Sequence, residues 1–599
     1  MLKTKRLRNI LVLLFTVLLL TLSLAAGATA GIASSSYKNS AIVSVDAGET
    51  WIVDRTTRVD VLKIADGAVI TAPEGYSLTM TVNGIGTPIE PGTYIGNIVL
   101  TPTENIIVQY RELDPHYLKT GIYIENGKYV PEKSVAAVVS EGKVVGKSIK
   151  DVKITSNEEK FNGIIVTGNS KFNILNPQVY LTGNGGNDFA GYGAGIMTGG
   201  NADVTVDGAT IINEGCIRPA IFVGDNSVLR VNNSHIESRN GTLPEDYSFT
   251  IEMGKMMECP WMLGIKGNCR TTNLVGNGTV YYNNCYIKSE AWGALSTDDT
   301  NTVRMYVTDS LIETVKSGYG AYSIGDSIDT FTRSTMNVAD YGLIMANGSG
   351  SGVFDASVVN SGKIGVMMHG GNEGNLLINN GSVFNTKKAV IQVKSSYPTI
   401  VVDNAELNSE SGIILQAVEN DDPFMAMMMA GGGPGGPPAG DAAPPADTGS
   451  QEPKTINATF KNVTLNGDFM NAMTALGGLN LTFENAVVKG AITTATVEHA
   501  TGPNGEPVTM DHPELYYLIG EFIPTYCATE DPYGVNATFA RGSQWIVDKT
   551  SYLTGLTIAK GASVTAPEGY SLTMTVNGVE RPIIPGTYSG RIVLAVNPE

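Results

Sequence analysis

A short sequence pattern recurs along the middle of the chain at intervals of about 24 residues, and this repeat constrains the fold more than any other feature. Each copy has alternating apolar residues followed by Asn or Asp, a small residue, any residue and an aliphatic one. Clear copies cover residues 231–236, 282–287 and 307–312, and the same asparagine position returns at Asn380, Asn404, Asn462 and Asn485. Units of this length cannot bury an apolar face alone, so neighbouring units must stack. The repeat therefore predicts a solenoid.

A second pattern begins at a glycine and lies about ten residues beyond the first in most repeats. It covers residues 293–297, 320–324, 342–346, 365–369 and 412–416. Each repeat thus supplies at least two short strands rich in β-branched residues, separated by turns of Gly, Asn, Asp and Ser. No helical period competes with this pattern. We expect an all-β chain in which the recurring asparagines stack as a ladder and hydrogen-bond to the neighbouring backbone.

In repeat length, strand pattern and asparagine position, roughly residues 150–495 resemble the right-handed parallel β-helix proteins of the pectate-lyase-like superfamily. The resemblance implies a right-handed parallel β-helix with rungs of about 24 residues. It does not specify an activity, because that superfamily contains lyases, glycosidases, adhesins and binding proteins.

Two gaps in the repeat are about twice the usual length and predict insertions at residues 239–279 and 421–455. The second insertion is of low complexity, with a methionine-rich stretch followed by a run of Gly, Pro and Ala. Clustered thioethers can bind Cu(I), but a loop that touches a surface or hangs free is the commoner use of such a segment.

A duplicated module flanks the repeats, at residues 48–103 and 542–599. The two copies are related by a shift of 494 residues, and Thr71–Gly84 is identical to Thr565–Gly578. Alternating apolar residues and tight turns predict β-strands in both copies. We favour terminal caps, which a solenoid needs to stay soluble. Paired binding modules are the alternative.

The N-terminus has the features of an export signal. Four basic residues precede an apolar run over residues 10–26, and small residues follow at Ala28 and Ala30. We expect a signal peptide over residues 1–30, cleaved after Ala30, although an uncleaved membrane anchor is the alternative. The protein would then be secreted or held at the cell surface, and would meet a membrane only transiently during export.

The charge balance narrows the class of partner. Lys and Arg number 40 and Asp and Glu 58, which gives a formal net charge of −18. This charge disfavours nucleic acid and anionic membranes as partners.

The chain has five cysteines, an odd number that leaves at least one thiol unpaired. Cys259–Cys269 and Cys216–Cys285 are candidate disulfides, and Cys527 is the fifth cysteine. The alternative is that the cysteines are buried thiols that pack as small apolar residues.

Three aspartates could form a cluster on one edge of the solenoid. Aligning the second strands on Gly293 and Gly320 places Asp299 beside Asp326, with Asp298 one position earlier. Equivalent positions on successive rungs lie about 4.8 Å apart, so the carboxylates repel unless a cation bridges them or one is protonated. Calcium prefers such oxygen clusters, so these aspartates are a candidate calcium site. The alternative is that they are solvated turn residues.

The resemblance also implies what such a site could do. Polysaccharide lyases of this fold use calcium to bind the carboxylate of an acidic sugar, with Arg or Lys as the base. The candidate bases are Arg218, Lys255, Lys266, Arg270 and Lys394. The motifs of polygalacturonases are absent as a set, because only fragments of them stand at residues 296–299 and 369–370.

Two tryptophans are candidate sugar contacts, because proteins commonly bind sugars through aromatic faces that lie beside polar groups. Trp261 lies in the first insertion, and Trp292 precedes the strand that leads to Asp298. Methionines surround Trp261 in the sequence, which favours the alternative of a small satellite core.

Taken together, these patterns predict an exported β-helix protein that binds a polymer, most simply a polysaccharide, without catalysis. Calcium is the candidate cofactor. A calcium-dependent lyase or glycosidase using Asp298, Asp299 and Asp326 is one alternative. A structural adhesin that assembles through its flanking modules is the other.

Overall fold

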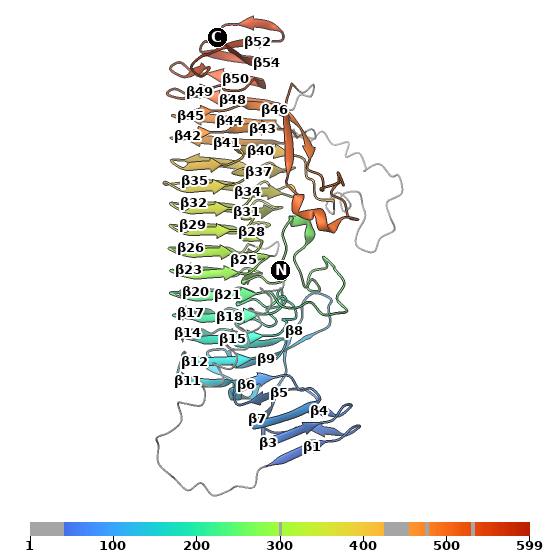
Figure 1. Cartoon of the computed structure of the whole chain (residues 1–599). Coiled ribbons are helices and arrows are strands. Elements are labelled where there is room, and N and C mark those ends of the chain that lie inside the picture. The colour runs from blue at the N-terminus through green and yellow to red at the C-terminus, as the bar shows by residue number, and fades with distance from the viewer. Residues whose placement is uncertain (1–40, 299–301, 424–453, 474–477, 529–533) are drawn as a thin grey trace, which may run out of the picture. The chain divides into compact units, whose positions relative to one another are not determined.

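A computed structural model gives the fold of the chain and describes residues 41–298, 302–423, 454–473, 478–528 and 534–599 (Figure 1). The expected signal peptide, Asp299 and residues 424–453 of the second insertion lie outside these described residues. The chain divides into two units, Met1–Ile42 and Val43–Glu599, and the faces and sites considered below belong to the second.

Three stacks of short parallel strands form the faces of a β-helix. The first face contains β14 (Lys171–Leu175), β17 (Asp203–Asp207), β20 (Val228–Asn232), β23 (Thr279–Asn283), β26 (Arg304–Thr308), β29 (Ile328–Thr332), β32 (Ser351–Asp355), β35 (Asn375–Asn379), β38 (Thr399–Asp403), β41 (Thr455–Lys461), β44 (Gly478–Glu484) and β48 (Val535–Phe539). The second face contains β15 (Gln178–Thr182), β18 (Thr210–Glu214), β21 (His235–Arg239), β24 (Tyr286–Ser289), β27 (Leu311–Thr314), β30 (Thr335–Val338), β33 (Val358–Ser361), β36 (Val383–Thr386) and β39 (Glu406–Ser409), followed by β42 (Thr464–Asn466), β45 (Val487–Lys489) and β49 (Gln544–Ile546).

The third face is a separate sheet. It contains β9 (His116–Glu125), β13 (Phe161–Thr167), β16 (Ile196–Thr198), β19 (Ile221–Val223), β22 (Thr272–Leu274), β25 (Gly293–Thr297), β28 (Tyr319–Ile324), β31 (Tyr341–Ala346), β34 (Ile364–His369), β37 (Ile391–Lys394), β40 (Ile413–Val418), β43 (Asp468–Asn471) and β46 (Ile492–His499). Each strand pairs in parallel with the equivalent strand one rung away, as in the pairing of β31 with β34. The prediction of an all-β parallel solenoid is confirmed.

The alternation of apolar and polar residues explains why these segments are strands. In β26, Met305 and Val307 are buried, while the alternate residues Arg304, Tyr306 and Thr308 are exposed or half-buried. Inward positions repeat from rung to rung, so aromatic rings form a row inside the helix. Phe331 stacks on Phe354, and Phe384 meets Phe354 edge to face, with ring centroids 5.0 Å apart in both pairs. This distance is close to the separation of paired strands. Burial of such rows is the main stabilising term of the fold.

The recurring asparagine lies at the bend between the first and second faces. Asn233, Asn284 and Asn380 have φ of 52°, 52° and 55°, a left-handed conformation that Asn tolerates better than most residues. The ladder is made through side chains and not, as expected, through the backbone. The Asn284 amide donates to Asn233 Oδ1 at 2.8 Å, and that of Asn380 donates to Asp355 Oδ1 at 2.7 Å.

Two excursions from the helix meet each other beside the third face (Figure 1). The Trp261 strap (residues 240–271) leaves after β21 and contains the short helix η3 (Trp261–Leu263). The Tyr516 strap (residues 500–528) follows β46 and contains η4 (Pro513–Leu518) and β47 (Phe522–Tyr526), which pairs antiparallel with β46. The ring of Trp261 packs edge-on against that of Tyr516, with centroids 5.6 Å apart.

The duplicated sequences fold with the same strand pattern. The first copy contains β2 (Thr50–Ile52), β3 (Thr57–Ile64), β4 (Val69–Thr71), β5 (Tyr76–Val82), β6 (Ile85–Thr87) and β7 (Gly92–Glu104). The second contains β49, β50 (Ser551–Ile558), β51 (Ser563–Thr565), β52 (Tyr570–Val576), β53 (Val579–Arg581) and β54 (Gly586–Pro598). The remaining elements are β1 (Ile42–Val45), β8 (Ile106–Val108), β10 (Lys128–Tyr129), η1 (Pro131–Lys133), η2 (Ala136–Val138), β11 (Val139–Val145) and β12 (Ser148–Ser156).

The two copies differ at one strand edge. In the first copy, β6 pairs with β12 through Gly86 and Ser156, and a Cβ atom on Gly86 would lie 2.2 Å from the Ser156 hydroxyl. In the second copy, Glu580 stands at the position of Gly86, and β53 pairs only with β52 among the described residues. A charged side chain on an open strand edge opposes pairing with another chain.

All five cysteines are free thiols, so neither candidate disulfide is present. Four of them are buried, and burial raises the pKa of Cys216 and Cys269 to about 12 and that of Cys285 to about 11. These thiols pack as small apolar residues, as the alternative interpretation expected.

Candidate functional site: a groove floored by stacked amides

A groove of about 1090 Å³ runs along the second face. Its floor is one row of outward-facing side chains on six neighbouring strands of the second face. These strands are β24, β27, β30, β33, β36 and β39. In register along the row are Lys288, Glu313, Asn337, Asn360, Asn385 and Asn408. The groove therefore crosses the rungs and presents one polar side chain per rung.

The four asparagines are joined by side-chain hydrogen bonds. Each amide donates to the Oδ1 atom of the asparagine one rung before it, over 2.8 Å from Asn360 to Asn337, 2.8 Å from Asn385 to Asn360 and 2.9 Å from Asn408 to Asn385. An asparagine amide has two N–H donors and two acceptor lone pairs. Within this ladder, an inner asparagine uses one donor and one lone pair, so one donor and one lone pair remain without a partner among the described residues.

The charges that line the groove cancel. Lys288 and Glu313 continue the floor at one end, and Lys387 and Glu410 lie in turns at its border. Two lysines against two glutamates leave no net formal charge. The groove can therefore offer many hydrogen bonds to a ligand without a strong preference for either sign of charge.

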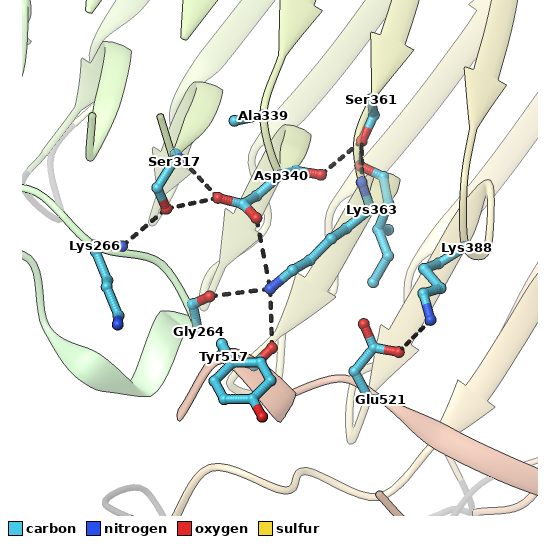
Figure 2. Close-up of polar contacts among 12 residues, drawn as sticks. Gly264, Lys266, Ser317, Ala339, Asp340, Ser361, Lys363, Lys388, Tyr517 and Glu521 are labelled. Carbon is cyan, nitrogen blue, oxygen red and sulfur yellow. Dashed lines mark hydrogen bonds and ion pairs between the residues drawn. The ribbon is translucent and has the colours of Figure 1, made fainter. Parts of the chain in front are cut away.

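The turns that border the groove also hold the two straps in place (Figure 2). The Lys363 ammonium donates to the carbonyl of Gly264 in the Trp261 strap at 3.1 Å and to that of Tyr517 in the Tyr516 strap at 3.0 Å. It also lies 3.5 Å from the Asp340 carboxylate, which accepts hydrogen bonds from the Ser317 side chain and the Gly318 backbone, both at 2.7 Å. One lysine thus ties both straps to the helix.

The register at Asp298 differs from the one that the sequence alignment assumed. Thr297 pairs with Ser323, which places Asp298 level with Ile324 and moves the register by one residue from the glycine alignment. Asp298 is buried and forms an ion pair with Arg270. Asp326 is exposed and accepts hydrogen bonds from Ser349, which lower its pKa.

Calcium binding by Asp298, Asp299 and Asp326 stays a prediction, because Asp299 lies outside the described residues. Within those residues, no group of three His, Cys, Asp or Glu side chains could hold a metal ion.

Arg270, one of the candidate bases, is the centre of a buried network. Besides Asp298, its guanidinium binds Asp188, with Nη2 at 2.7 Å and Nε at 2.9 Å from Oδ2. Its charged group also lies 4.8 Å from the ring centroids of both Phe189 and Trp292. Trp292 is only 2% exposed, so a ligand could reach its ring only by displacing this network.

Trp261 lies in the first strap, at its contact with the Tyr516 strap. One face of its ring stacks on Phe249, with centroids 3.5 Å apart, and Tyr516 meets its edge. Neither Trp261 nor Trp292 lines the groove, so their contact with a sugar stays a prediction.

The other candidate bases have different environments. Arg218 is completely buried and donates to the backbone carbonyls of Glu158, Phe161, Gly183, Asn184 and Gly193. Burial lowers its pKa to about 10. Lys255 pairs with Glu252 at 2.7 Å within the Trp261 strap, and Lys266 is exposed there. The five hydrogen bonds of the Arg218 guanidinium to backbone carbonyls make Arg218 a structural anchor.

Lys394 belongs to a buried cluster that secures the Tyr516 strap. Its ammonium contacts Asp421 Oδ1 at 2.5 Å, and Asp421 Oδ2 also accepts from His499 at 2.8 Å and from the Gly520 backbone at 2.6 Å. His369 lies beside this cluster, and burial followed by the Lys394 charge lowers its pKa to about 3. Sequence patterns gave no sign of Asp421, His499 or Gly520.

The part of the chain that the structure describes contains no helix long and apolar enough to cross a membrane. No protein-family model matches the sequence, and a search of curated proteins found none with significant similarity.

Proposed function

We propose that the protein is an exported, non-catalytic binding protein that holds a polysaccharide of low charge along the groove. The observation that carries this proposal is the ladder of Asn337, Asn360, Asn385 and Asn408, which repeats the same amide on four successive rungs. Rungs are separated by about 4.8 Å, a distance comparable to the length of one sugar unit in an extended chain. A linear polymer can therefore meet the same donor and acceptor at each step.

The chemistry of the ladder suits hydroxyl groups. Because the ladder holds each amide in place, the donors and lone pairs that remain are preorganised, and little side-chain entropy is lost on binding. A sugar hydroxyl both donates and accepts a hydrogen bond and so complements an amide that offers one of each. The balance of charge along the groove favours an uncharged polymer over a strongly acidic one.

The finer identity of the fold belongs to the same proposal. We assign the helix to the right-handed, pectate-lyase-like type on the basis of repeat length and asparagine position. The basic and apolar segments at the N-terminus support secretion or a place at the cell surface.

The proposal is tested by affinity electrophoresis of the chain without residues 1–30 in gels that contain neutral polysaccharides (β-glucan, mannan, xylan) or acidic ones (polygalacturonate, alginate). The groove variant is Asn360→Ala/Asn385→Ala. The matched control is Asn457→Ala/Asn480→Ala, which removes amides of another ladder, joined at 3.0 Å on β41 and β44 and outside the groove. Each experiment is repeated with a chelator and followed by an assay for released sugar.

We expect retardation by at least one neutral polysaccharide, unchanged by the chelator and without release of sugar. The groove variant should bind at least about tenfold more weakly, because each lost hydrogen bond contributes about 0.5–1.5 kcal/mol and 1.4 kcal/mol is a factor of ten. The control should bind as the wild type does. Chelator-sensitive binding with release of sugar would support the calcium-dependent lyase or glycosidase instead, and binding to no polysaccharide would leave the adhesin hypothesis.

A further inference from the structure

A second cavity, of about 480 Å³, lies across the bordering turns from the groove. Residues of the same turns line both spaces: Lys387 lines the groove and Lys388 the cavity, while Gly362 lines the groove and Ile364 the cavity. The floor of the cavity comes from β37, β40 and β43 of the third face. Its wall is the stretch Gly520–Tyr526 of the Tyr516 strap.

Two buried glutamine side chains form the floor. Gln392 and Gln416 are neighbours in register on β37 and β40, and they are 1% and 4% exposed. The Gln392 amide donates to the Gly520 carbonyl at 2.8 Å, but its Oε1 atom is buried without a hydrogen-bond partner among the described residues. The Gln416 side chain makes no hydrogen bond to any described residue. Because an unpaired buried polar group costs about 1–3 kcal/mol, this floor is suited to a ligand that bonds to amides.

A carboxylate fixes one side of the cavity. Asp468, at the start of β43, accepts from the Ala491 backbone at 2.8 Å through Oδ1. Its Oδ2 atom accepts from the Tyr526 hydroxyl and the Lys549 ammonium, each at 2.6 Å. Burial and the Asp468 carboxylate raise the pKa of Tyr526, so its hydroxyl remains a donor and is not a base. In this arrangement both oxygens of the Asp468 carboxylate accept hydrogen bonds from the protein.

On the opposite side of the cavity, the charged side chains are also paired. Lys388 pairs with Glu521 at 2.8 Å, just as Lys549 pairs with Asp468. Apolar side chains, among them Ile413, Phe522 and Pro524, complete the walls. The cavity thus combines an unpaired Gln392 Oε1 atom, a Gln416 amide that makes no hydrogen bond to a described residue, apolar walls and no uncompensated charge. Its volume lies within the range of small-molecule sites.

We propose that this cavity binds one uncharged, hydroxyl-bearing unit of monosaccharide size, with Gln392 and Gln416 as its principal hydrogen-bonding groups. The hydroxyls of such a ligand supply a donor for Gln392 Oε1 and partners for the Gln416 amide, while its C–H faces contact the apolar walls. The site is separate from the groove and does not depend on the binding of a polysaccharide there.

The test is saturation-transfer NMR on the chain without residues 1–30. The neutral probes are the methyl glycosides of glucose, mannose, galactose and N-acetylglucosamine, and the charged probes are glucuronate and glucosamine. Gln416→Leu removes one amide without breaking a hydrogen bond of the fold. Ser411→Trp places a bulky side chain at an exposed position that lines the cavity. Asn480→Ala, which is outside both the cavity and the groove, is the matched control, and Asn360→Ala/Asn385→Ala reports on the groove.

We expect at least one neutral probe to bind the wild type and the Asn480→Ala chain, and to bind both cavity variants at least tenfold more weakly. The groove variant should bind this probe as the wild type does, so the failure of one site is distinguishable from the failure of the other. The proposal is overturned if no neutral probe binds, if only charged probes bind, or if binding survives in both cavity variants while their circular dichroism matches the wild type.

Discussion

Acidification should destabilise the protein through His369, the last residue of β34. Its side chain is buried, 7% of the residue is exposed, and its Nε2 atom has no hydrogen-bond partner among the described residues. Burial and the nearby Lys394 ammonium lower the pKa of His369 to about 3, although Asp421 opposes that shift. The ordinary pKa of a histidine in an unfolded chain is about 6.5.

The sign of the effect follows from these two pKa values. Because the folded pKa of His369 lies below the unfolded value, the unfolded chain takes up the proton first as the pH falls. Each pH unit between about 6.5 and 3 then removes up to about 1.4 kcal/mol of stability. Going from pH 6.5 to 4.5 therefore costs about 2–3 kcal/mol at this one residue.

Neighbouring groups affect other parts of the pH range. Burial lowers the pKa of His499, but the hydrogen bond to Asp421 has the larger effect, so the pKa is raised above its ordinary value. The contribution of His499 to stability is therefore complete below about pH 6.5 and is lost as the pH rises. Burial opposes but does not prevent the lowering of the Asp421 pKa by Lys394, so the loss from this carboxylate begins near pH 4. Burial raises the pKa of Asp329 to about 8, so this carboxyl group stabilises the fold as the pH falls from 6.5 to 4.5 and opposes the effect of His369. Only the difference between the wild type and a His369 variant therefore isolates the contribution of His369.

The assay is the free energy or midpoint of unfolding of the wild type and of His369→Gln at several pH values in that interval. Glutamine keeps a similar volume and cannot be protonated. The wild type should lose about 2–3 kcal/mol more than the variant between pH 6.5 and 4.5, and an exposed control, His512→Gln, should follow the wild type. Parallel pH profiles for the wild type and His369→Gln would refute the reasoning.

Three further changes test the packing. Arg218→Met should lower stability by about 3 kcal/mol or more, measured as a fall in Tm, because five backbone carbonyls lose a buried donor; an unchanged Tm would contradict its role as an anchor. Lys363→Met should speed hydrogen exchange in residues 240–271 and 500–528 but not in distant rungs, and uniform exchange would count against a local tie. Glu580→Gly/Arg581→Thr should give concentration-dependent oligomers in light scattering, whereas a variant as monodisperse as the wild type would show that these charges do not protect the edge.

The repeat could be recognised in the sequence because each rung makes the same bend. Asn233, Asn284 and Asn380 must adopt a left-handed conformation, so the same residue type returns at a fixed spacing. The groove asparagines follow these bends closely, as Asn385 follows Asn380, and aligning the strands beyond each bend would have found them.

The register of the third face and the straps could not be read in the same way. Tyr319, not Gly320, is level with Gly293, since the packing of inward residues and not the glycine decides the pairing. The bond from Arg270 to Asp188 joins residues 82 positions apart and follows no period. Contacts of that kind depend on how a strap folds back, which local patterns do not encode.

The duplicated modules show how the surroundings change the role of the same sequence. Thr71–Gly84 and Thr565–Gly578 are identical, yet the strands that follow meet different partners. Gly86 lets β6 approach β12, whereas Glu580 keeps the equivalent strand edge in solvent. The interpretation of both modules as terminal caps stays a prediction.

The central claim is that a linear polysaccharide lies across the rungs of the groove, about one sugar unit to each amide. Its most direct test is isothermal titration with neutral oligosaccharides of increasing length, taken from whichever polysaccharide the chain binds. Because six rungs contribute side chains to the floor and successive rungs are about 4.8 Å apart, affinity should rise with each added unit and level off between about four and six units. The Asn360→Ala/Asn385→Ala chain should lose this dependence on length. An affinity that is the same for one unit as for the longest chain, or a dependence on length that survives in the variant, would contradict the claim.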